Sequence, residues 1–213
     1  MILKKEYITK LKDIIYFMSI SQSSIFHLSD NSKDNLYENI TRIDFNSLYA
    51  NIQIGLFNEG LIDEKWKGDI ERVQWFIKNR ADLKRLSPVE YQKWKIHCNS
   101  LHDKIKSPYV VEYLDMFYTD LIQKYGDLII HTNVDILYLN INKGDKLISE
   151  INDFSYDIQY INYFYIEERL RYIEQEESGT TNFGRRCDIS KKDYLYGIIK
   201  RFNRKRKLEE LGI

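Results

Sequence analysis

The stretch from residue 62 to 105 constrains the fold most, because it predicts two long helices joined by a tight turn. Apolar residues recur at three- and four-residue steps before Ser87-Pro88 and again after it, which is the period of a helix face. Ser87-Pro88-Val89-Glu90 has the form of a capping box with proline at the first helical position. The stretch therefore predicts an antiparallel helical hairpin. Its apolar stripes are Trp66, Ile70, Val73, Ile77 and Ala81, and then Trp94, Cys98, Leu101 and Ile105.

The segments on either side of this hairpin mix helical and strand patterns. Before it, we expect a helix over 5–20, a loop over 21–36, a strand over Ile40–Phe45 and a helix from about Ser47 to Phe57. After it, we expect a helix over 109–125, a β-hairpin of Asp127–His131 and Asp135–Ile141, a helix over 147–158, strands within Tyr160–Ile173 and a helix over Lys191–Leu211. This order of elements predicts an α+β fold.

Charge is balanced over the whole chain but is unevenly placed. The 32 Lys and Arg equal the 32 Asp and Glu, yet residues 185–207 hold ten cations against two acids. Such a run either contacts a polyanion or is a solvated helix end. The cations that we assign to a nucleic-acid-binding segment are Arg185, Arg186, Lys200, Arg201, Arg204, Lys205, Arg206 and Lys207.

Composition excludes several classes of protein. Two cysteines are too few for a disulfide framework, and the four histidines lack zinc-type spacing. No run reaches the roughly 18 apolar residues that a membrane span needs. We therefore expect an intracellular protein with no membrane contact and no structural zinc. Abundant Tyr, Ile, Asn and Lys with few Gly and Pro indicate an AT-rich genome.

The segment Asp44-Phe45-Asn46-Ser47-Leu48-Tyr49 lies where the predicted strand turns into a helix. A carboxylate at a strand end, followed by the N–H groups of a helix N-terminus, suits metal and triphosphate binding. The alternative is an Asp or Asn that only caps an ordinary helix. Taken alone, the segment favours the cap.

The same six residues resemble motif A of family B DNA polymerases, which reads Asp-x-x-Ser-Leu-Tyr and then Pro, replaced here by Ala50. The resemblance implies that Asp44 is a catalytic metal ligand. It also implies that Ser47 and Leu48 lend backbone groups to the triphosphate and that Tyr49 excludes ribonucleotides.

The second helix of the hairpin resembles motif B, Lys-x-x-x-Asn-Ser-x-Tyr-Gly. Lys95, Asn99 and Ser100 match, while His102-Asp103 replaces the Tyr-Gly that checks the nascent base pair. The resemblance implies that the nucleotide-binding residues are Ser47, Leu48, Tyr49, Arg80, Lys95 and Asn99. The plain alternative is that these cations are solvated charges.

The predicted β-hairpin lies where motif C, Tyr-x-Asp-Thr-Asp-Ser, would be. Its second Asp is Asp135, whereas the first is replaced by Asn133 and the Ser by Ile136. The resemblance implies that Asp44 and Asp135 would be the metal ligands of any surviving activity. We expect no cofactor, or Mg²⁺ if the active site is retained; otherwise Asp135 is a turn residue.

The resemblance implies a truncated palm-and-fingers core of the protein-primed phage or linear-plasmid type. We expect an N-terminal helix and loop (1–36), a palm-like antiparallel sheet with packed helices (37–61 and 106–175), a fingers-like helical hairpin (62–105) and a basic C-terminal helical segment (176–213).

Three functions remain open at this point. The first is a non-catalytic, nucleic-acid-binding or structural subunit that contacts DNA or RNA phosphates and other proteins in an organelle ribonucleoprotein or ribosome, or in a phage particle. The second is a minimal metal-dependent polymerase or nucleotidyltransferase that is completed by a partner. The third is a scaffold without nucleic acid contact. The mitochondrial matrix and the phage-infected cytoplasm are the expected compartments.

Overall fold

The structure is a computed structural model of the chain. It describes residues 3–13, 35–105, 107–142, 151, 154–168, 171–183 and 192–210. The chain divides into two compact units. The helical unit comprises Met1–Gln22, Phe45–Asp120 and Asn152–Ser155, and the sheet unit comprises Ser23–Asp44, Leu121–Ile151 and Tyr156–Ile213.

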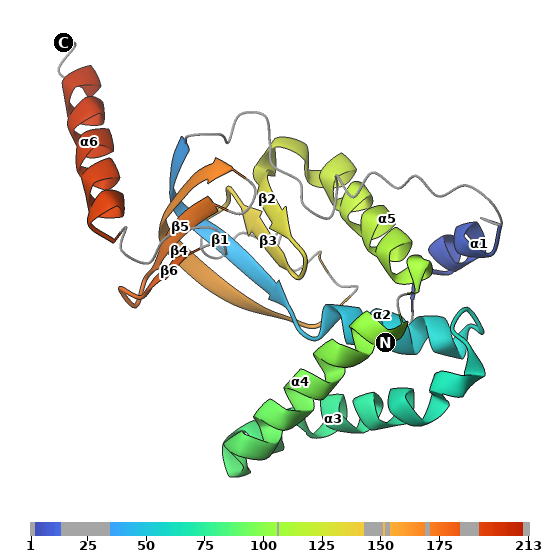
Figure 1. The fold of residues 1–213 in the computed structure, drawn as a ribbon. Helices are drawn as coiled ribbons and strands as arrows, with labels where there is room; N and C mark the ends of the chain where they lie inside the picture. Colours follow the sequence, from blue (N-terminus) through green and yellow to red (C-terminus); the bar gives the residue numbers. More distant parts are fainter. Residues whose placement is uncertain are drawn as a thin grey trace. The chain divides into compact units, whose positions relative to one another are not determined.

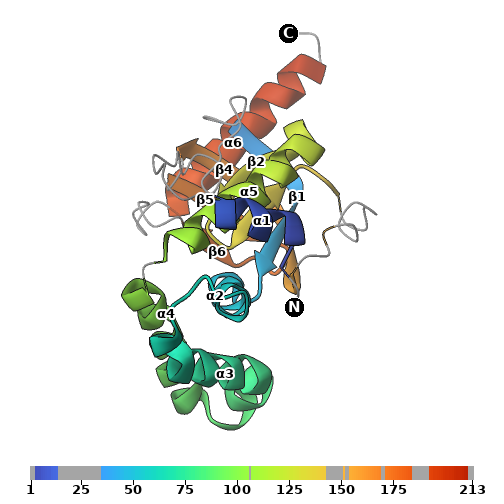
Figure 2. The same cartoon turned by 90° about the vertical axis from the view of Figure 1, so that its right-hand side faces the viewer.

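The helical unit contains the expected hairpin. Its elements are α1 (Lys5–Asp13), α2 (Leu48–Asn58), the 3₁₀ turn η2 (Glu64–Trp66), α3 (Lys67–Leu86), α4 (Pro88–Ile105) and the part of α5 (Pro108–Tyr125) up to Asp120. Helices α3 and α4 lie side by side in both views (Figures 1 and 2), and α2 contacts both of them. Ser87 alone separates α3 from α4, and Pro88 is the first residue of α4. The prediction of an antiparallel helical hairpin is therefore confirmed.

The helix boundaries differ from the predicted ones in places. Helix α3 begins at Lys67 rather than residue 62, because η2 and its Asp63 cap come first. The buried side chains of α3 are Ile70, Val73 and Phe76, whereas Ala81, which the predicted stripe included, is exposed. Helix α1 is described as far as Asp13; residues 14–20 of the predicted helix lie outside the described residues.

A close approach and an aromatic cluster hold the helical unit together. A Cβ added to Gly55 would come within 2.5 Å of the Leu3 side chain, so α2 needs glycine where it meets Leu3. Phe45 packs edge-on against Phe117 at 5.4 Å and against Phe154 at 6.3 Å between ring centroids. Such pairs add to the burial of apolar area. This core anchors Phe45, three residues before α2 begins at Leu48.

The sheet unit holds six strands in the order β2-β3-β1-β4-β5-β6. Their bounds are β1 (Asn35–Phe45), β2 (Ile129–Asn133), β3 (Ile136–Leu139), β4 (Tyr156–Glu168), β5 (Arg171–Glu176) and β6 (Thr181–Phe183). Short η3 (Gly126–Leu128) precedes β2, and α6 (Lys192–Glu210) follows β6. The β1–β3, β2–β3, β4–β5 and β5–β6 pairs are antiparallel. Helices and an antiparallel sheet confirm the α+β class.

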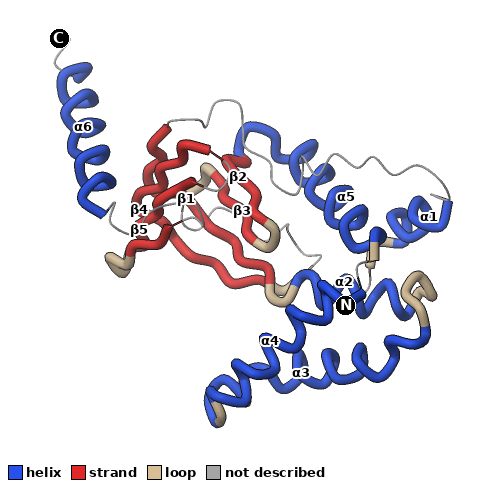
Figure 3. The backbone as a smooth tube through the Cα atoms, viewed as in Figure 1, coloured by secondary structure: helices blue, strands red, loops and turns tan. Residues whose placement is uncertain are grey.

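One prediction about this unit is wrong and two boundaries are displaced. The helix predicted over 147–158 is not formed at its described end, because β4 begins at Tyr156 and its place between β1 and β5 in the sheet overrides local propensity. The loop predicted over 21–36 ends two residues early because β1 begins at Asn35, and residues 21–34 lie outside the described residues. The β2–β3 turn consists of Val134 and Asp135, and Asn133 belongs to β2. Figure 3 draws this turn in tan between the two strands.

The core of the sheet unit is aromatic. Tyr138, Phe164 and Tyr172 are buried together, and the Tyr138 and Phe164 rings stack at 4.3 Å. Ile198 of α6 packs in a second cluster with Leu36, Tyr165 and Ile173, which attaches α6 to the sheet. No described helix is long and apolar enough to cross a membrane.

Candidate functional site

The turn between β1 and α2 contains a strained residue. Ser47 has φ 51° and ψ 40°, the left-handed region that non-glycine residues seldom adopt. The turn is held by Asn51, whose backbone N–H donates to the Ser47 carbonyl at 3.0 Å and whose side-chain amide donates to the Asn46 carbonyl at 3.0 Å. Strain of this kind costs about 1–3 kcal/mol and recurs at functional sites.

Arg80 of α3 reaches this turn within the helical unit. Its Nη1 lies 2.9 Å from the Ser47 hydroxyl and 3.5 Å from Asn46 Oδ1. Helix α2 has no acidic residue in its first turn, so the partial positive charge of its N-terminus lies beside a guanidinium. The structure thus brings two predicted nucleotide-binding residues, Arg80 and Ser47, into an electropositive corner suited to phosphate.

The other predicted nucleotide-binding residues are placed differently. Leu48 is buried, and Tyr49 is half-buried on α2. Lys95 and Asn99 are exposed on α4, and no hydrogen bond joins them to Ser47 among the described side chains. Burial raises the pKa of the nearby Cys98 thiol to about 11, with Arg80 acting in the opposite direction. The part of Leu48, Tyr49, Lys95 and Asn99 in nucleotide binding stays a prediction.

Asp135 lies at the β2–β3 turn of the sheet unit. Asn133 pairs with Ile136 across a two-residue connection of Val134 and Asp135, and Val134 has φ 60°. Ile136 is also the cross-strand partner of Asp44 in β1. Asp135 is therefore the second residue of this turn, directly after the strained Val134, and is one residue from the partner of Asp44.

Asp44 is held by a guanidinium that the sequence analysis missed. Arg42 Nη2 lies 3.2 Å from Asp44 Oδ2, and Arg42 Nη1 lies 2.7 Å from Glu174 Oε1 of β5. Burial raises the pKa of Glu174, with Arg42 opposing that rise. For Arg42, burial works to lower the pKa, but Glu174 and then Tyr138, Asp44 and Tyr172 raise it. The alternation Arg42-x-Asp44 could have placed both on one sheet face, but nothing local indicated Glu174.

The donor set does not fit the metal ions that the resemblance implies. Asp44 already contacts an internal cation, and Asn133 stands where a further carboxylate would be. Within the described ranges, no group of three or more His, Cys, Asp or Glu is arranged to hold a metal ion. The geometry of the sheet end fits an ion pair, and metal binding by Asp44 and Asp135 stays a prediction.

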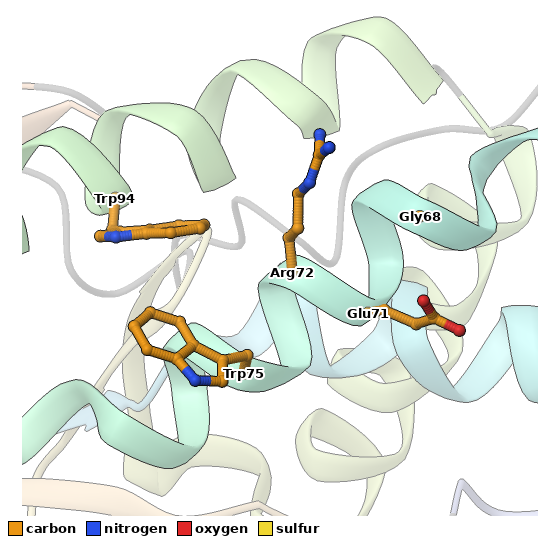
Figure 4. A pocket seen from close by; sticks show the side chains of 5 residues that line it. All are labelled: Gly68, Glu71, Arg72, Trp75 and Trp94. Carbon is orange, nitrogen blue, oxygen red and sulfur yellow. The ribbon is translucent and has the colours of Figure 1, made fainter.

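A pocket on the α3–α4 hairpin adds a site that the motifs did not indicate (Figure 4). It has a volume of about 430 Å³ and is lined by Gly68, Glu71, Arg72, Trp75 and Trp94. The Trp75 and Trp94 ring centroids lie 5.1 Å apart at 47°, and Glu71 points away from them. Trp75 is 47% exposed, so an indole surface beside a guanidinium faces solvent.

The predicted basic segment is partly described. Lys200, Arg201, Arg204, Lys205 and Lys207 are exposed on α6. Arg185 and Arg186 lie outside the described residues, as does the side chain of Arg206. Exposure on one helix suits both alternatives that the charge pattern left open, a polyanion contact and a solvated helix end, so nucleic-acid binding by these cations stays a prediction.

No family model and no curated protein matches the sequence. Among solved structures, the family B DNA polymerase from the hyperthermophilic archaeon Pyrobaculum calidifontis is similar, with a TM-score of 0.44 and 15% identity. The likeness covers 72% of this chain and spans 28% of the length of that polymerase. At that TM-score it carries no structural argument.

Proposed function

We propose that this chain is a polymerase-derived, non-catalytic protein that binds nucleic acid as a subunit of a larger assembly. An organelle ribonucleoprotein or a phage particle fits such a subunit. The observation that carries the proposal is the placement of the motif residues. The Asp44–Tyr49 segment lies on a strand, a strained turn and a helix, with Arg80 at Ser47, while Asp44 is paired with Arg42 at 3.2 Å.

Nucleic acid binding is supported by the exposed cations of α6 and by the tryptophan pocket. Cations that contact phosphates release condensed counter-ions, which makes affinity fall as salt rises. An exposed indole next to Arg72 can stack on an unpaired base, as aromatic side chains do in single-strand binding proteins. The two features together favour single-stranded DNA or RNA.

The test is fluorescence anisotropy with a labelled single-stranded oligonucleotide from about 50 to 200 mM salt. Replacing Lys200, Arg201 and Arg204 with Gln should weaken binding and lower the salt slope by about two. A matched variant replaces the exposed Lys5, Lys10 and Lys12 of α1 with Gln. Equal effects of the two triple variants would count against α6 as the contact surface.

Membership of an assembly has a separate test. The native protein should sediment in a large particle that nuclease breaks up. A free, small protein in both conditions would remove the subunit role and leave nucleic acid binding to stand alone.

The second candidate is a minimal nucleotidyltransferase, completed by a partner chain. The Arg80–Ser47 contact and the Asp135 turn beside β1 favour it. It requires divalent-metal-dependent nucleotide incorporation that Asp44→Asn abolishes. Incorporation that survives this substitution would rule out Asp44 as a catalytic residue.

A further inference from the structure

Arg42 precedes Asp44 by two residues in β1, so strand alternation places both side chains on one face of the sheet. The same guanidinium contacts Asp44 at 3.2 Å and Glu174 at 2.7 Å. The Arg42 side chain is 14% exposed and that of Glu174 is 2% exposed, whereas that of Asp44 is 37% exposed. One cation therefore joins a partly exposed carboxylate to a buried one.

A third carboxylate belongs to this cluster. The Asn182 amide donates to Glu174 Oε1 at 3.1 Å and to Glu176 Oε1 at 2.8 Å. Glu174 Oε2 is buried and lacks a hydrogen-bond partner of ordinary geometry in the described part of the chain. The cluster thus places one guanidinium and one amide against three acids, so it holds fewer positive charges than carboxylates.

Hard divalent cations bind carboxylate oxygens that are brought together from different elements, but with Arg42 in place no three acids of the described residues are arranged around one. We propose that Arg42 is an internal counter-ion that stands in place of such a cation, so Asp44 and Glu174 do not bind a divalent metal in the native chain. The inference rests on the proposed function, because it gives a physical reason why the chain would not catalyse nucleotidyl transfer.

Removing the guanidinium should uncover a latent metal site. With a neutral side chain at position 42, Asp44, Glu174 and Glu176 would repel one another, and a divalent cation would relieve that repulsion. The metal site would then arise from removal of the Arg42 guanidinium alone, without any added metal-binding residue.

The experiment is Mn²⁺ binding to the full chain, measured by electron paramagnetic resonance of the free ion. Wild-type protein should show no Mn²⁺ binding that Asp44→Asn removes. Arg42→Met should bind Mn²⁺ at least about tenfold more tightly than wild type, and adding Asp44→Asn to it should abolish the gain. Arg85→Met, which removes an exposed arginine paired with Asp82 at 3.3 Å, should leave Mn²⁺ binding unchanged.

Two results would overturn the inference. One is a wild-type Mn²⁺ site that Asp44→Asn removes, and the other is a folded Arg42→Met protein with no gain in binding. If Arg42→Met alone does not fold, Arg42→Gln keeps a polar side chain at position 42 without its charge and takes its place. Arg42→Gln should then gain Mn²⁺ binding that Asp44→Asn removes, and a folded Arg42→Gln protein without that gain would also refute the inference.

Oligonucleotide binding by the same samples separates this inference from the proposed function. A wild-type protein that binds Mn²⁺ at Asp44 and also binds single strands through α6 refutes only the proposed role of Arg42 as an internal counter-ion. If wild type does not bind Mn²⁺, Arg42→Met gains a Mn²⁺ site and neither protein binds nucleic acid, only the proposed function is refuted.

Discussion

The sheet unit and the α3–α4 hairpin differ in which side chains they bury and which they expose. The sheet unit buries charge, with the Glu174 side chain 2% exposed beside Arg42, and it stacks Tyr138 on Phe164 in its buried core. The hairpin exposes hydrocarbon, with Leu86 70%, Val89 69% and Ile96 67% exposed. Buried charge requires an internal partner, and exposed apolar surface is characteristic of interaction sites.

The difference bears on the proposed function. Asp44 contacts Arg42 within the sheet unit, whereas the tryptophan pocket and the cations of α6 are exposed to solvent. This contrast is the reason for proposing binding rather than catalysis. Four measurements test this contrast.

The largest effect is expected from Arg42→Met. Breaking a buried ion pair by removing one partner leaves an uncompensated charge and costs about 3–5 kcal/mol. Urea denaturation followed by circular dichroism gives the free energy of unfolding. The exposed control Arg85→Met should change it by less than about 0.5 kcal/mol. Equal losses in the two variants would mean that the sheet end does not depend on its internal cation.

A smaller effect is expected in the pH dependence of Glu174→Gln. Burial, opposed by Arg42, raises the pKa of Glu174 above its ordinary 4.5, so the folded protein binds a proton more tightly than the unfolded chain. The stability that this group adds is full below the unfolded pKa and is lost as pH rises through the folded pKa. The unfolding free energy of wild type minus that of Glu174→Gln should therefore fall as pH rises above about 4.5. A difference that rises with pH would contradict the shift.

Val134→Gly tests the strained turn before Asp135. Valine at φ 60° costs about 1–2 kcal/mol relative to glycine, so the substitution should raise the free energy of unfolding by about 1 kcal/mol. Val89→Gly is the matched control on helix α4, where glycine should lower stability by about the same amount. The two valines should therefore shift the thermal midpoint in opposite directions, and a fall in both would contradict the strain.

The smallest effect is expected from Trp75→Ala. Loss of one partly exposed stacking surface should weaken single-stranded oligonucleotide binding by about 1 kcal/mol, or about fivefold in Kd. Anisotropy titration measures the change, and Leu86→Ala serves as a control that removes an exposed apolar side chain away from the pocket. Equal affinities for all three proteins would exclude the pocket as a base-stacking surface.

Much of the fold could be predicted where the signal is local. Pro88 separates α3 from α4, and the apolar pattern of 109–125 and 191–211 predicts α5 and α6 closely. The helix predicted over 147–158 fails because Tyr156 and Ile158 enter β4, whose place between β1 and β5 in the sheet no local pattern reveals. The Val134-Asp135 turn was displaced because valine is a poor turn residue.

The candidate site shows the same division. Arg80 and Ser47 were predicted through short motifs, and the structure joins them at 2.9 Å. The Arg42–Glu174 pair was missed because it depends on the order β1-β4-β5 in the sheet. The tryptophan pocket was missed because Trp94 reads as an apolar stripe residue of α4.

The Arg42–Glu174 hydrogen bond joins residues that are 132 positions apart in the chain. Contacts between such distant residues are costly to close early, since the intervening chain must be ordered first. We therefore expect the bond to form after the folding barrier, so its loss would accelerate unfolding and leave the folding rate nearly unchanged. The Arg42 side chain would then slow unfolding and thereby set how long the native sheet persists once it has formed.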